Sequence, residues 1–228
     1  MTEENEAFVD PEEAERDREA IWSYLLRLRR RGFTDHRLLS ALESVPRRLF
    51  VPHDAREAAY IERALPIECG QTISAPEIVA MMTSALEVQP DHQVLEIGTG
   101  SGYQAAVLSK LAAHVYTIDR FRTLSELAQL RFKTLKLQNI TALVGDGSLG
   151  WPANASFDRI MVTAAAEEVP EALFAQLKPD GILVAPVGPP DGPQVLLAYR
   201  RDDKNGFTTT TLADVRFVPL IPGKAERL

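Results

Sequence analysis

A carboxylate followed by three alternating glycines stands near the middle of the chain, in the segment Glu96-Ile97-Gly98-Thr99-Gly100-Ser101-Gly102-Tyr103. The apolar residues 94–97 are typical of a buried strand, and residues 103–111 have the apolar spacing of a helix. The glycines therefore occupy a strand-to-helix turn, where a ligand can approach the backbone and meet free amides at the helix start. The expected ligand contacts are Gly98, Thr99, Gly100, Gly102 and Tyr103.

The residues around this turn favour one nucleotide cofactor over another. The fingerprint of nicotinamide and flavin sites, Gly-x-Gly-x-x-Gly, needs a glycine where this chain has Tyr103. A negative charge on Glu96 would repel a pyrophosphate but attract the cationic amino and sulfonium groups of S-adenosylmethionine. Asp119 ends the next apolar strand, where a carboxylate can accept hydrogen bonds from ribose, and Arg120 follows it. We therefore expect S-adenosylmethionine, held by Glu96, the glycine turn, Asp119 and Arg120.

A third acid follows the third strand of this region, in Gly145-Asp146-Gly147. In open α/β sheets, ligands bind beyond the carboxyl ends of the strands. Asp146 can accept a hydrogen bond from an adenine amine there, while Gly147 leaves room for the flat ring. A plain turn explains this segment nearly as well when it is taken alone.

The composition limits the class of protein. With 228 residues, 45% hydrophobic and 25% charged, the chain suits one globular domain with a sizeable core. A formal net charge of −7 opposes binding to a nucleic-acid backbone. The chain has one cysteine, Cys69, four scattered histidines, no membrane-length apolar stretch and no signal-peptide pattern at its start. We expect no metal, no nucleic-acid or membrane partner, a cytoplasmic location and a monomer.

The order of elements predicts the fold. Helices are expected between Asp10 and Gly32, at 34–44 and at 78–86, with an irregular segment at 60–70. Strands at 94–97, 115–118, 140–144, 157–163 and 182–187 alternate with helices at 102–112, 123–136 and 169–177, and a hairpin follows at 195–200 and 208–217. This order indicates an α/β fold with a doubly wound, mostly parallel, Rossmann-like sheet, N-terminal helices and a C-terminal β-hairpin. Residues 1–228 are expected to form one methyltransferase domain, with residues 1–20 as a flexible acidic extension.

Several segments together resemble the protein-L-isoaspartate O-methyltransferase family. They are Gln71-Thr72-Ile73-Ser74-x-Pro76, Val94 to Tyr103, Gly145-Asp146-Gly147-x-x-Gly150-Trp151, Phe157-Asp158-Arg159-Ile160, Gln176-Leu177-Lys178 and Phe217-Val218-Pro219-Leu220. The similarity runs from about Thr34 to Leu220. The glycine turn is shared by many methyltransferases, whereas Thr-Ile-Ser-x-Pro about twenty residues before it is specific to this family.

The resemblance implies transfer of a methyl group from S-adenosylmethionine to the α-carboxylate of L-isoaspartyl residues in damaged proteins and peptides. It implies Ser74 as the active-site hydroxyl, with Thr72 and Ile73 lining the acceptor site. It also implies that Glu96 and the glycine turn hold the methionine part, Asp119 the ribose, and Asp146 and Gly147 the adenine. Family members often have aspartate at the position of Glu62 and glutamate at that of Asp119.

Alternatives remain open at this point. Ser74-Ala75-Pro76-Glu77 also matches a capping box, in which the serine hydroxyl accepts from the amide of Glu77 and could still donate to a ligand. Thr123-Leu124-Ser125-Glu126 matches the same pattern, and there we predict a helix cap only. A nucleic-acid or small-molecule methyltransferase would share the fold. Residues 163–166, Thr-Ala-Ala-Ala, stand where amino-methylating nucleic-acid enzymes usually have Asn/Asp-Pro-Pro-aromatic. A non-catalytic cofactor-binding protein is the third alternative, which the presence of Ser74, Glu96, Asp119 and Asp146 disfavours.

Overall fold

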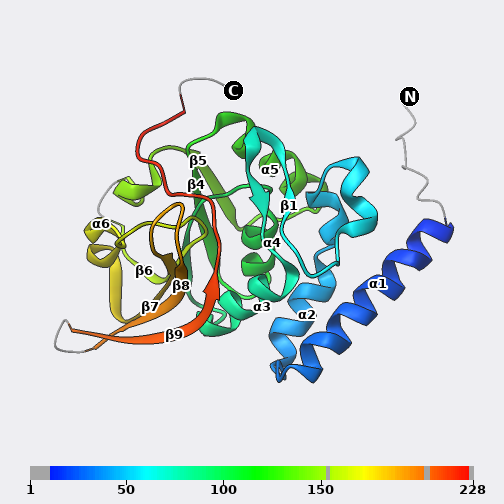
Figure 1. The fold of residues 1–228 in the computed structure, drawn as a ribbon, viewed down its shortest axis with the longest axis horizontal. Coiled ribbons are helices and arrows are strands. Elements are labelled where there is room, and N and C mark those ends of the chain that lie inside the picture. The colour runs from blue at the N-terminus through cyan, green and yellow to red at the C-terminus, as the bar shows by residue number, and fades with distance from the viewer. Residues whose placement is uncertain (1–10, 153–154, 203–205, 226–228) are drawn as a thin grey trace.

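The computed structural model describes residues 11–152, 155–202 and 206–225, which form a seven-stranded sheet covered by helices (Figure 1). In spatial order the strands are β5 (Ile140–Val144), β4 (His114–Asp119), β3 (Gln93–Ile97), β6 (Phe157–Val162), β7 (Leu177–Val187), β8 (Gln194–Arg201) and β9 (Phe207–Val215). The pairs from β5 to β7 are parallel, and β8 and β9 add on in antiparallel fashion. The predicted doubly wound, mostly parallel sheet with a terminal hairpin is confirmed.

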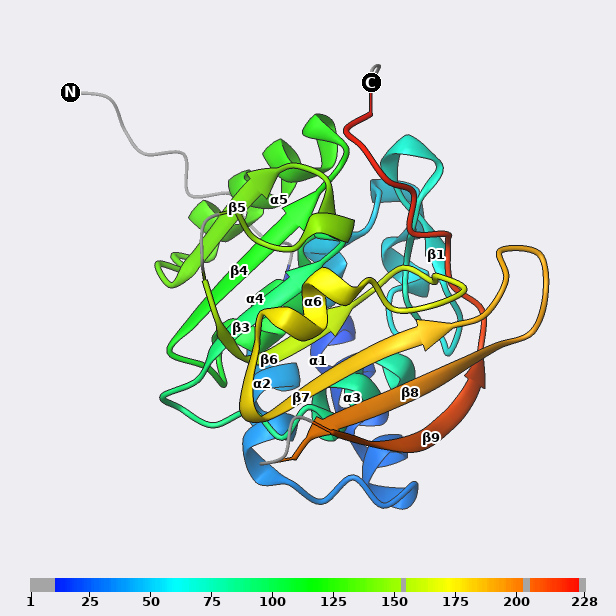
Figure 2. The same ribbon diagram turned by 90° about the vertical axis from the view of Figure 1, so that its left-hand side faces the viewer.

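The α-helices of the described chain are α1 (Pro11–Arg30), α2 (His36–Ser44), α3 (Pro76–Ala85), α4 (Tyr103–Ser109), α5 (Arg122–Thr134) and α6 (Glu171–Ala175). Apolar residues of α1 to α5 pack together on one face of the sheet, whereas α6 packs on the other (Figure 2). Alternation along β3 sends Val94 toward the thick helical layer and Leu95 and Ile97 toward the α6 side. Buried strands and apolar helix faces therefore make a core on both sides of the sheet.

The order of the strands creates the place where a ligand can bind. Strand β3 lies between β4 and β6, so the chain leaves β3 toward one side of the sheet and later returns to its other side. Connections after such neighbouring strands diverge and leave a crevice at their carboxyl ends. The segments that follow Ile97, Asp119 and Val162 surround this crevice.

Shorter elements precede the sheet and carry the acceptor motif. They are the 3-10 turns η1 (Arg47–Phe50), η2 (His53–Ala58) and η3 (Glu68–Gly70), and the strands β1 (Leu65–Pro66) and β2 (Thr72–Ile73); a fourth turn, η4 (Gly147–Leu149), follows β5. Strands β1 and β2 pair in antiparallel fashion, Leu65 with Ile73 and Pro66 with Thr72. The expected irregular segment at 60–70 is thus part of a short hairpin.

Some expected boundaries differ from the structure. Residues 11–20 belong to α1, so the acidic extension does not reach residue 20; Asp10 lies outside the described residues. Helix α5 begins at Arg122 after Phe121, which makes no side-chain cap, so the predicted cap at Thr123 is wrong. Strand β7 starts at Leu177, five residues earlier than the expected 182, and α6 is correspondingly short.

No helix in the described part of the chain is long and apolar enough to cross a membrane. Among the same residues, no three histidine, cysteine or acidic side chains gather where a metal ion would need them.

Candidate active site

One cavity lies at the crevice beyond β3, β4 and β6. The residues that were expected in the site and that line it are Thr72, Ile73, Ser74, Gly98, Thr99, Gly100, Tyr103, Asp119, Arg120 and Gly147. Segments that are far apart in sequence therefore meet at one place, as the fold predicts. Three of the expected residues, Glu96, Gly102 and Asp146, do not line the cavity.

The hairpin β1–β2 holds the acceptor motif against the glycine turn. Ile73 is buried in the core, while Thr72 and Ser74 remain at least partly exposed and border the cavity. The tight turn before Thr72 is closed by a hydrogen bond from the Ile67 amide to the Gln71 carbonyl at 2.8 Å. Apolar anchoring of one side chain thus fixes the two hydroxyl side chains next to it.

Ser74 does not cap α3 in this structure. The N-cap of α3 is Ala75, which offers no side-chain acceptor, and the Glu77 amide donates instead to Oε1 of Glu62 at 2.8 Å. The Ser74 hydroxyl makes no hydrogen bond to any residue that the structure describes. The capping-box hypothesis for Ser74 is therefore wrong, and its hydroxyl is available on the cavity side.

Two glycines of the turn are required by close packing. Gly98 has φ +97°, and a Cβ there would lie 2.4 Å from Thr163 Oγ1, which itself donates to the Gly98 carbonyl. Gly102 has φ +88°, and a Cβ there would lie 2.9 Å from the Ala128 Cβ on α5. Gly102 therefore allows the turn to pack closely against α5, and it does not line the cavity.

Asp119 is a nearly buried carboxylate that faces the cavity, with 6% of its surface exposed. Its Oδ2 accepts from the Gly100 amide at 2.8 Å, and its Oδ1 accepts from the Phe121 amide at 2.9 Å. Burial raises the pKa of Asp119, and these amide hydrogen bonds oppose the shift by stabilising the anion. Asp119 thus ties the glycine turn to the end of β4 while presenting acceptor atoms to a ligand.

Glu96 lies behind the cavity instead of in it. Its side chain is 0% exposed, Thr117 Oγ1 donates to its Oε2 at 2.5 Å, and its Oε1 has no partner among the described residues. Burial raises the pKa of Glu96 to about 8, so the carboxyl is mostly protonated at neutral pH. The expected attraction between a Glu96 charge and a sulfonium is therefore not supported by this structure.

A chain of hydroxyl groups links Glu96 to the turn. Because the Thr117 hydroxyl donates to Glu96, it accepts from the Thr99 hydroxyl, whose Oγ1 lies 2.7 Å away. Thr99 lines the cavity. Glu96 therefore acts on the site indirectly, by anchoring Thr99 through Thr117.

Both carboxylate oxygens of Asp146 accept hydrogen bonds within the protein, one of them from the C-terminal segment. Its Oδ1 accepts from the amide and hydroxyl of Ser148, at 2.9 and 2.6 Å, and its Oδ2 accepts from the Gly223 amide at 2.7 Å. Burial raises the pKa of Asp146, but the hydrogen bonds from Ser148 and Gly223 outweigh it and leave the pKa below its ordinary value. The neighbouring Gly147, not Asp146, borders the cavity.

Several residues of the cavity were not assigned to the site from the sequence. They include Ile118, Phe121, Leu124, Thr163, Ala164, Val218, Pro219, Leu220 and Ile221. Residues 218–221 reach the cavity because the Ala165 amide donates to the Val218 carbonyl and the Leu220 amide donates to the Ala165 carbonyl. The Phe217-Val218-Pro219-Leu220 motif was the available signal, although its position over the cavity depends on the fold.

Comparison with known proteins agrees with this geometry. The family model for protein-L-isoaspartate(D-aspartate) O-methyltransferase matches residues 20–225. A protein-L-isoaspartate O-methyltransferase from Xanthobacter autotrophicus is 54% identical over 216 residues, covering 95% of this chain and 98% of that protein. The protein of the same name from Paracoccus denitrificans is 56% identical over 217 residues, with the same shares covered, 95% and 98%.

Solved structures show the same similarity at lower identity. A crystal structure from Plasmodium falciparum, described as a protein-L-isoaspartate O-methyltransferase in complex with S-adenosyl-L-homocysteine, superposes with a TM-score of 0.75 and 28% identity. The superposition covers 87% of this chain and 97% of the other.

Proposed function

Because this chain belongs to the protein-L-isoaspartate O-methyltransferase family, we propose that it methylates the α-carboxylate of L-isoaspartyl residues in damaged proteins and peptides, with S-adenosylmethionine as the methyl donor. The observation that carries this proposal is the meeting of Ser74, the glycine turn and Asp119 around one cavity. The resulting ester closes without the enzyme to a succinimide, whose hydrolysis returns some normal aspartate. The reaction is thus the start of protein repair.

The cavity fits S-adenosylmethionine. Asp119 offers carboxylate oxygens for ribose hydroxyls, next to Arg120 and the apolar surfaces of Ile118 and Phe121, which suit a flat adenine. The backbone of the turn at Gly98 and Gly100 borders the same space, where the methionine part would lie. When bound, S-adenosylmethionine supplies an activated methyl group. Selectivity for it rests on these contacts and not on a charge at Glu96.

The acceptor side requires orientation and no general base. A carboxylic acid with an ordinary pKa near ~4 is already ionised at neutral pH, so it is already a nucleophile. We assign the Ser74 hydroxyl as a hydrogen-bond donor to that carboxylate, with Thr72 and Ile73 shaping the site beside it. Correct orientation of reacting groups can lower a barrier by roughly 7–11 kcal/mol, which makes positioning sufficient for catalysis.

A methyl-transfer assay tests the proposed function. Two peptides of identical sequence are compared, one with an L-isoaspartyl residue and one with normal aspartate, using radiolabelled S-adenosylmethionine. We expect transfer only to the isoaspartyl peptide, because only it has a free α-carboxylate, attached directly to Cα. The free carboxylate of the normal peptide is the β-carboxylate, one methylene group further from Cα. Equal transfer to both peptides, or transfer to neither, would contradict the proposal.

We further propose that the enzyme acts as a single domain, as a monomer and in the cytoplasm, on protein and peptide substrates and not on nucleic acids. One hydrophobic cluster runs from Tyr24 on α1 to Leu196 on β8, which supports a single domain. The acceptor motif, the glycine turn and Asp119 of the same chain border one cavity, which is compatible with a monomer as the active unit. The net charge of −7 supports the exclusion of nucleic acids. Analytical ultracentrifugation and cell fractionation test the monomer and the location.

A further inference from the structure

Arg47, on η1, is a fully buried arginine behind the acceptor motif, with 0% of its surface exposed. Its Nε donates to the Ala59 carbonyl at 2.6 Å, and one terminal nitrogen, Nη2, donates to the Ser74 carbonyl at 2.5 Å. The other terminal nitrogen, Nη1, has no partner in the part of the chain that the structure describes. Arg47 therefore links η1, the segment after η2 and the acceptor motif.

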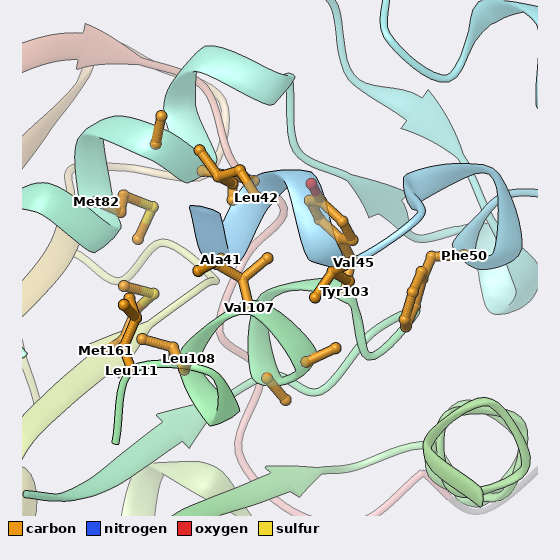
Figure 3. Close-up of a cluster of buried hydrophobic side chains, with 14 of the residues drawn as sticks. Ala41, Leu42, Val45, Phe50, Met82, Tyr103, Val107, Leu108, Leu111 and Met161 are labelled. Carbon is orange, nitrogen blue, oxygen red and sulfur yellow. The ribbon is translucent and has the colours of Figure 1, made fainter. Parts of the chain in front are cut away.

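The surroundings of Arg47 contain aromatic rings but no ion-pair partner among the described residues. The guanidinium carbon lies 4.8 Å from the ring centre of Tyr103, and the Tyr60 hydroxyl accepts from the Arg47 amide at 3.2 Å. Tyr103 packs edge-on against Phe50, with ring centres 5.4 Å apart, and Figure 3 shows it between Phe50 and α2. Glu62 is the carboxylate that favours the charged form of Arg47, and its Oε1 already accepts from the Glu77 amide.

A buried charge of this kind is costly unless something compensates it. Carbonyl oxygens and a ring face lower the cost, but an arginine remains charged in proteins, and breaking or omitting its ionic partner leaves an unfavourable buried charge. Burial lowers the pKa of Arg47, as expected for a desolvated cation. Two of the residues that it contacts, Ser74 through its carbonyl and Tyr103 through its ring, line the cavity. The positive charge therefore lies directly behind the surface that meets the acceptor.

We propose that Arg47 is a positioning residue for methyl transfer, which holds the Ser74 backbone from behind and whose charge is complemented by the acceptor carboxylate bound at the cavity. This inference rests on the proposed function, because that function makes the acceptor an anion. The carboxylate of the substrate thus provides a negative charge for the Arg47 guanidinium, which has no ion-pair partner among the described residues. A carboxylate would be preferred over an uncharged group of the same shape for this reason, beyond the hydrogen bond from Ser74.

The test compares two peptides that differ only in this charge. One contains an L-isoaspartyl residue with a free α-carboxylate, and the other has the same residue as its α-carboxamide. Binding of each to the protein saturated with S-adenosylhomocysteine is measured by calorimetry, and kcat and KM are measured with the isoaspartyl peptide. The variants are Arg47→Met, which removes the charge, and Arg47→Lys, which keeps it but cannot hold both the Ala59 and Ser74 carbonyls.

Arg159→Met is the matched control. Arg159 is also buried, with 9% exposure, and donates to the Leu86 carbonyl at 2.6 Å and the Glu87 carbonyl at 3.3 Å. It lies on β6, outside the cavity lining. Its loss therefore reports the general effect of removing a buried arginine, and unfolding curves for all variants show how much stability each change costs.

We expect the parent to prefer the carboxylate and Arg47→Met to lower that preference about tenfold or more, the size expected for one charge interaction across a partly desolvated site. Both peptides losing affinity equally in Arg47→Met would mean a merely structural role. Arg47→Lys should keep the preference within about threefold while kcat falls about tenfold, because the Ser74 backbone is held less well. Unchanged kcat in Arg47→Lys would overturn the positioning role.

If Arg47→Met does not fold, the binding of the two peptides by the parent protein still tests the inference. Equal binding of the carboxylate and carboxamide peptides by the parent overturns the inference without any variant. Failure of the proposed function has a different signature, since the parent would then fail to methylate the isoaspartyl peptide at all. Retained preference in Arg159→Met, together with loss in Arg47→Met, supports the inference.

Discussion

At the scale of single residues, the sequence pattern offered Ser74 for two roles, the cap of α3 and the hydrogen bond to the acceptor. In the structure Glu62 takes the first role and Ser74 is left with the second. Glu62 Oε1 accepts from the Glu77 amide and so caps α3, which leaves the Ser74 hydroxyl on the cavity side. A side chain from a distant segment has taken over the cap. The hydroxyl is thereby free to donate to an acceptor carboxylate.

Replacement of Ser74 by alanine should therefore lower methyl transfer much more than stability. We expect kcat to fall about 100-fold, since misalignment of about 1 Å costs that much, and the free energy of unfolding to change by less than about 0.5 kcal/mol. Glu62→Ala should do the reverse and cost about 1 kcal/mol of stability, with Glu62→Gln restoring most of it because its carbonyl can still accept. Turnover assays and urea melts measure both. A stability loss in Ser74→Ala equal to that of Glu62→Ala would contradict the assignment.

Glu96 leads to a pH-dependent prediction. Its folded-state pKa of about 8 lies above the ordinary value of 4.5, so between these pH values the unfolded chain has lost a proton that the folded protein keeps. The stability due to Glu96 is then fully present below about pH 4.5 and is lost as the pH rises toward 8. Glu96→Gln mimics the protonated form and can still accept from Thr117.

We expect the Glu96→Gln variant to gain stability relative to the parent as the pH rises from about 5 to about 8, by at least about 1 kcal/mol, because one pKa unit corresponds to about 1.4 kcal/mol. Urea unfolding of both proteins across this range measures the difference. A difference that is flat with pH would mean that Glu96 is ionised in the folded protein. Its charge would then be available to a cationic ligand after all.

At the scale of elements, the glycine turn shows how packing between helices determines a motif. Gly102 is the N-cap of α4, with φ +88°, and it lies against Ala128 and Phe132 of α5. The third glycine of the pattern was expected to serve the ligand. In the structure it lets α4 and α5 approach each other behind the turn.

Gly102→Ala should consequently destabilise the fold through crowding as well as through backbone strain. Gly32→Ala is a matched control, since Gly32 has a similar φ of +93° but nothing within 4 Å of the added Cβ. We expect Gly102→Ala to lower the free energy of unfolding by about 1–3 kcal/mol more than Gly32→Ala does. Equal losses in thermal or urea unfolding would mean that the backbone conformation alone requires glycine at 102.

At the scale of the whole molecule, the C-terminal segment runs from the end of β9 past the carboxyl ends of the parallel strands (Figure 1). Its residues 218–221 line one side of the cavity. The contacts that hold it include the pairing of Val218 and Leu220 with Ala165 and the hydrogen bond from the Gly223 amide to Asp146. The Ala225 amide also donates to the Arg120 carbonyl at 3.1 Å. Asp146, which was expected to bind adenine, thus holds this segment through a hydrogen bond to Gly223. Cofactor binding and the order of the C-terminal segment should be linked.

Asp146→Ala should loosen the segment and weaken the binding of S-adenosylhomocysteine. We expect faster hydrogen exchange at the Gly223 amide and a loss of affinity of about tenfold, since a hydrogen bond to a charged group contributes roughly 1.5–3 kcal/mol. Ser148→Ala is the control, because it removes one hydroxyl bond to Asp146 and keeps the bond from Gly223. Unchanged exchange at Gly223 in Asp146→Ala would show that the pairing with Ala165 and the hydrogen bond from Ala225 to Arg120 hold the segment without Asp146.

The sequence by itself determined the alternation of strands and helices, the glycine turn and the acids at the strand ends, because hydrophobic period and glycine spacing are local properties. Its resemblance to a known family also indicated the acceptor motif through Thr72, Ile73 and Ser74. Only the tertiary structure decided that Glu96 is buried behind Thr117, that Glu62 caps α3 and that Asp146 binds Gly223. Burial and hydrogen-bond partners depend on segments distant in sequence, so a residue's type and neighbours along the chain do not specify them.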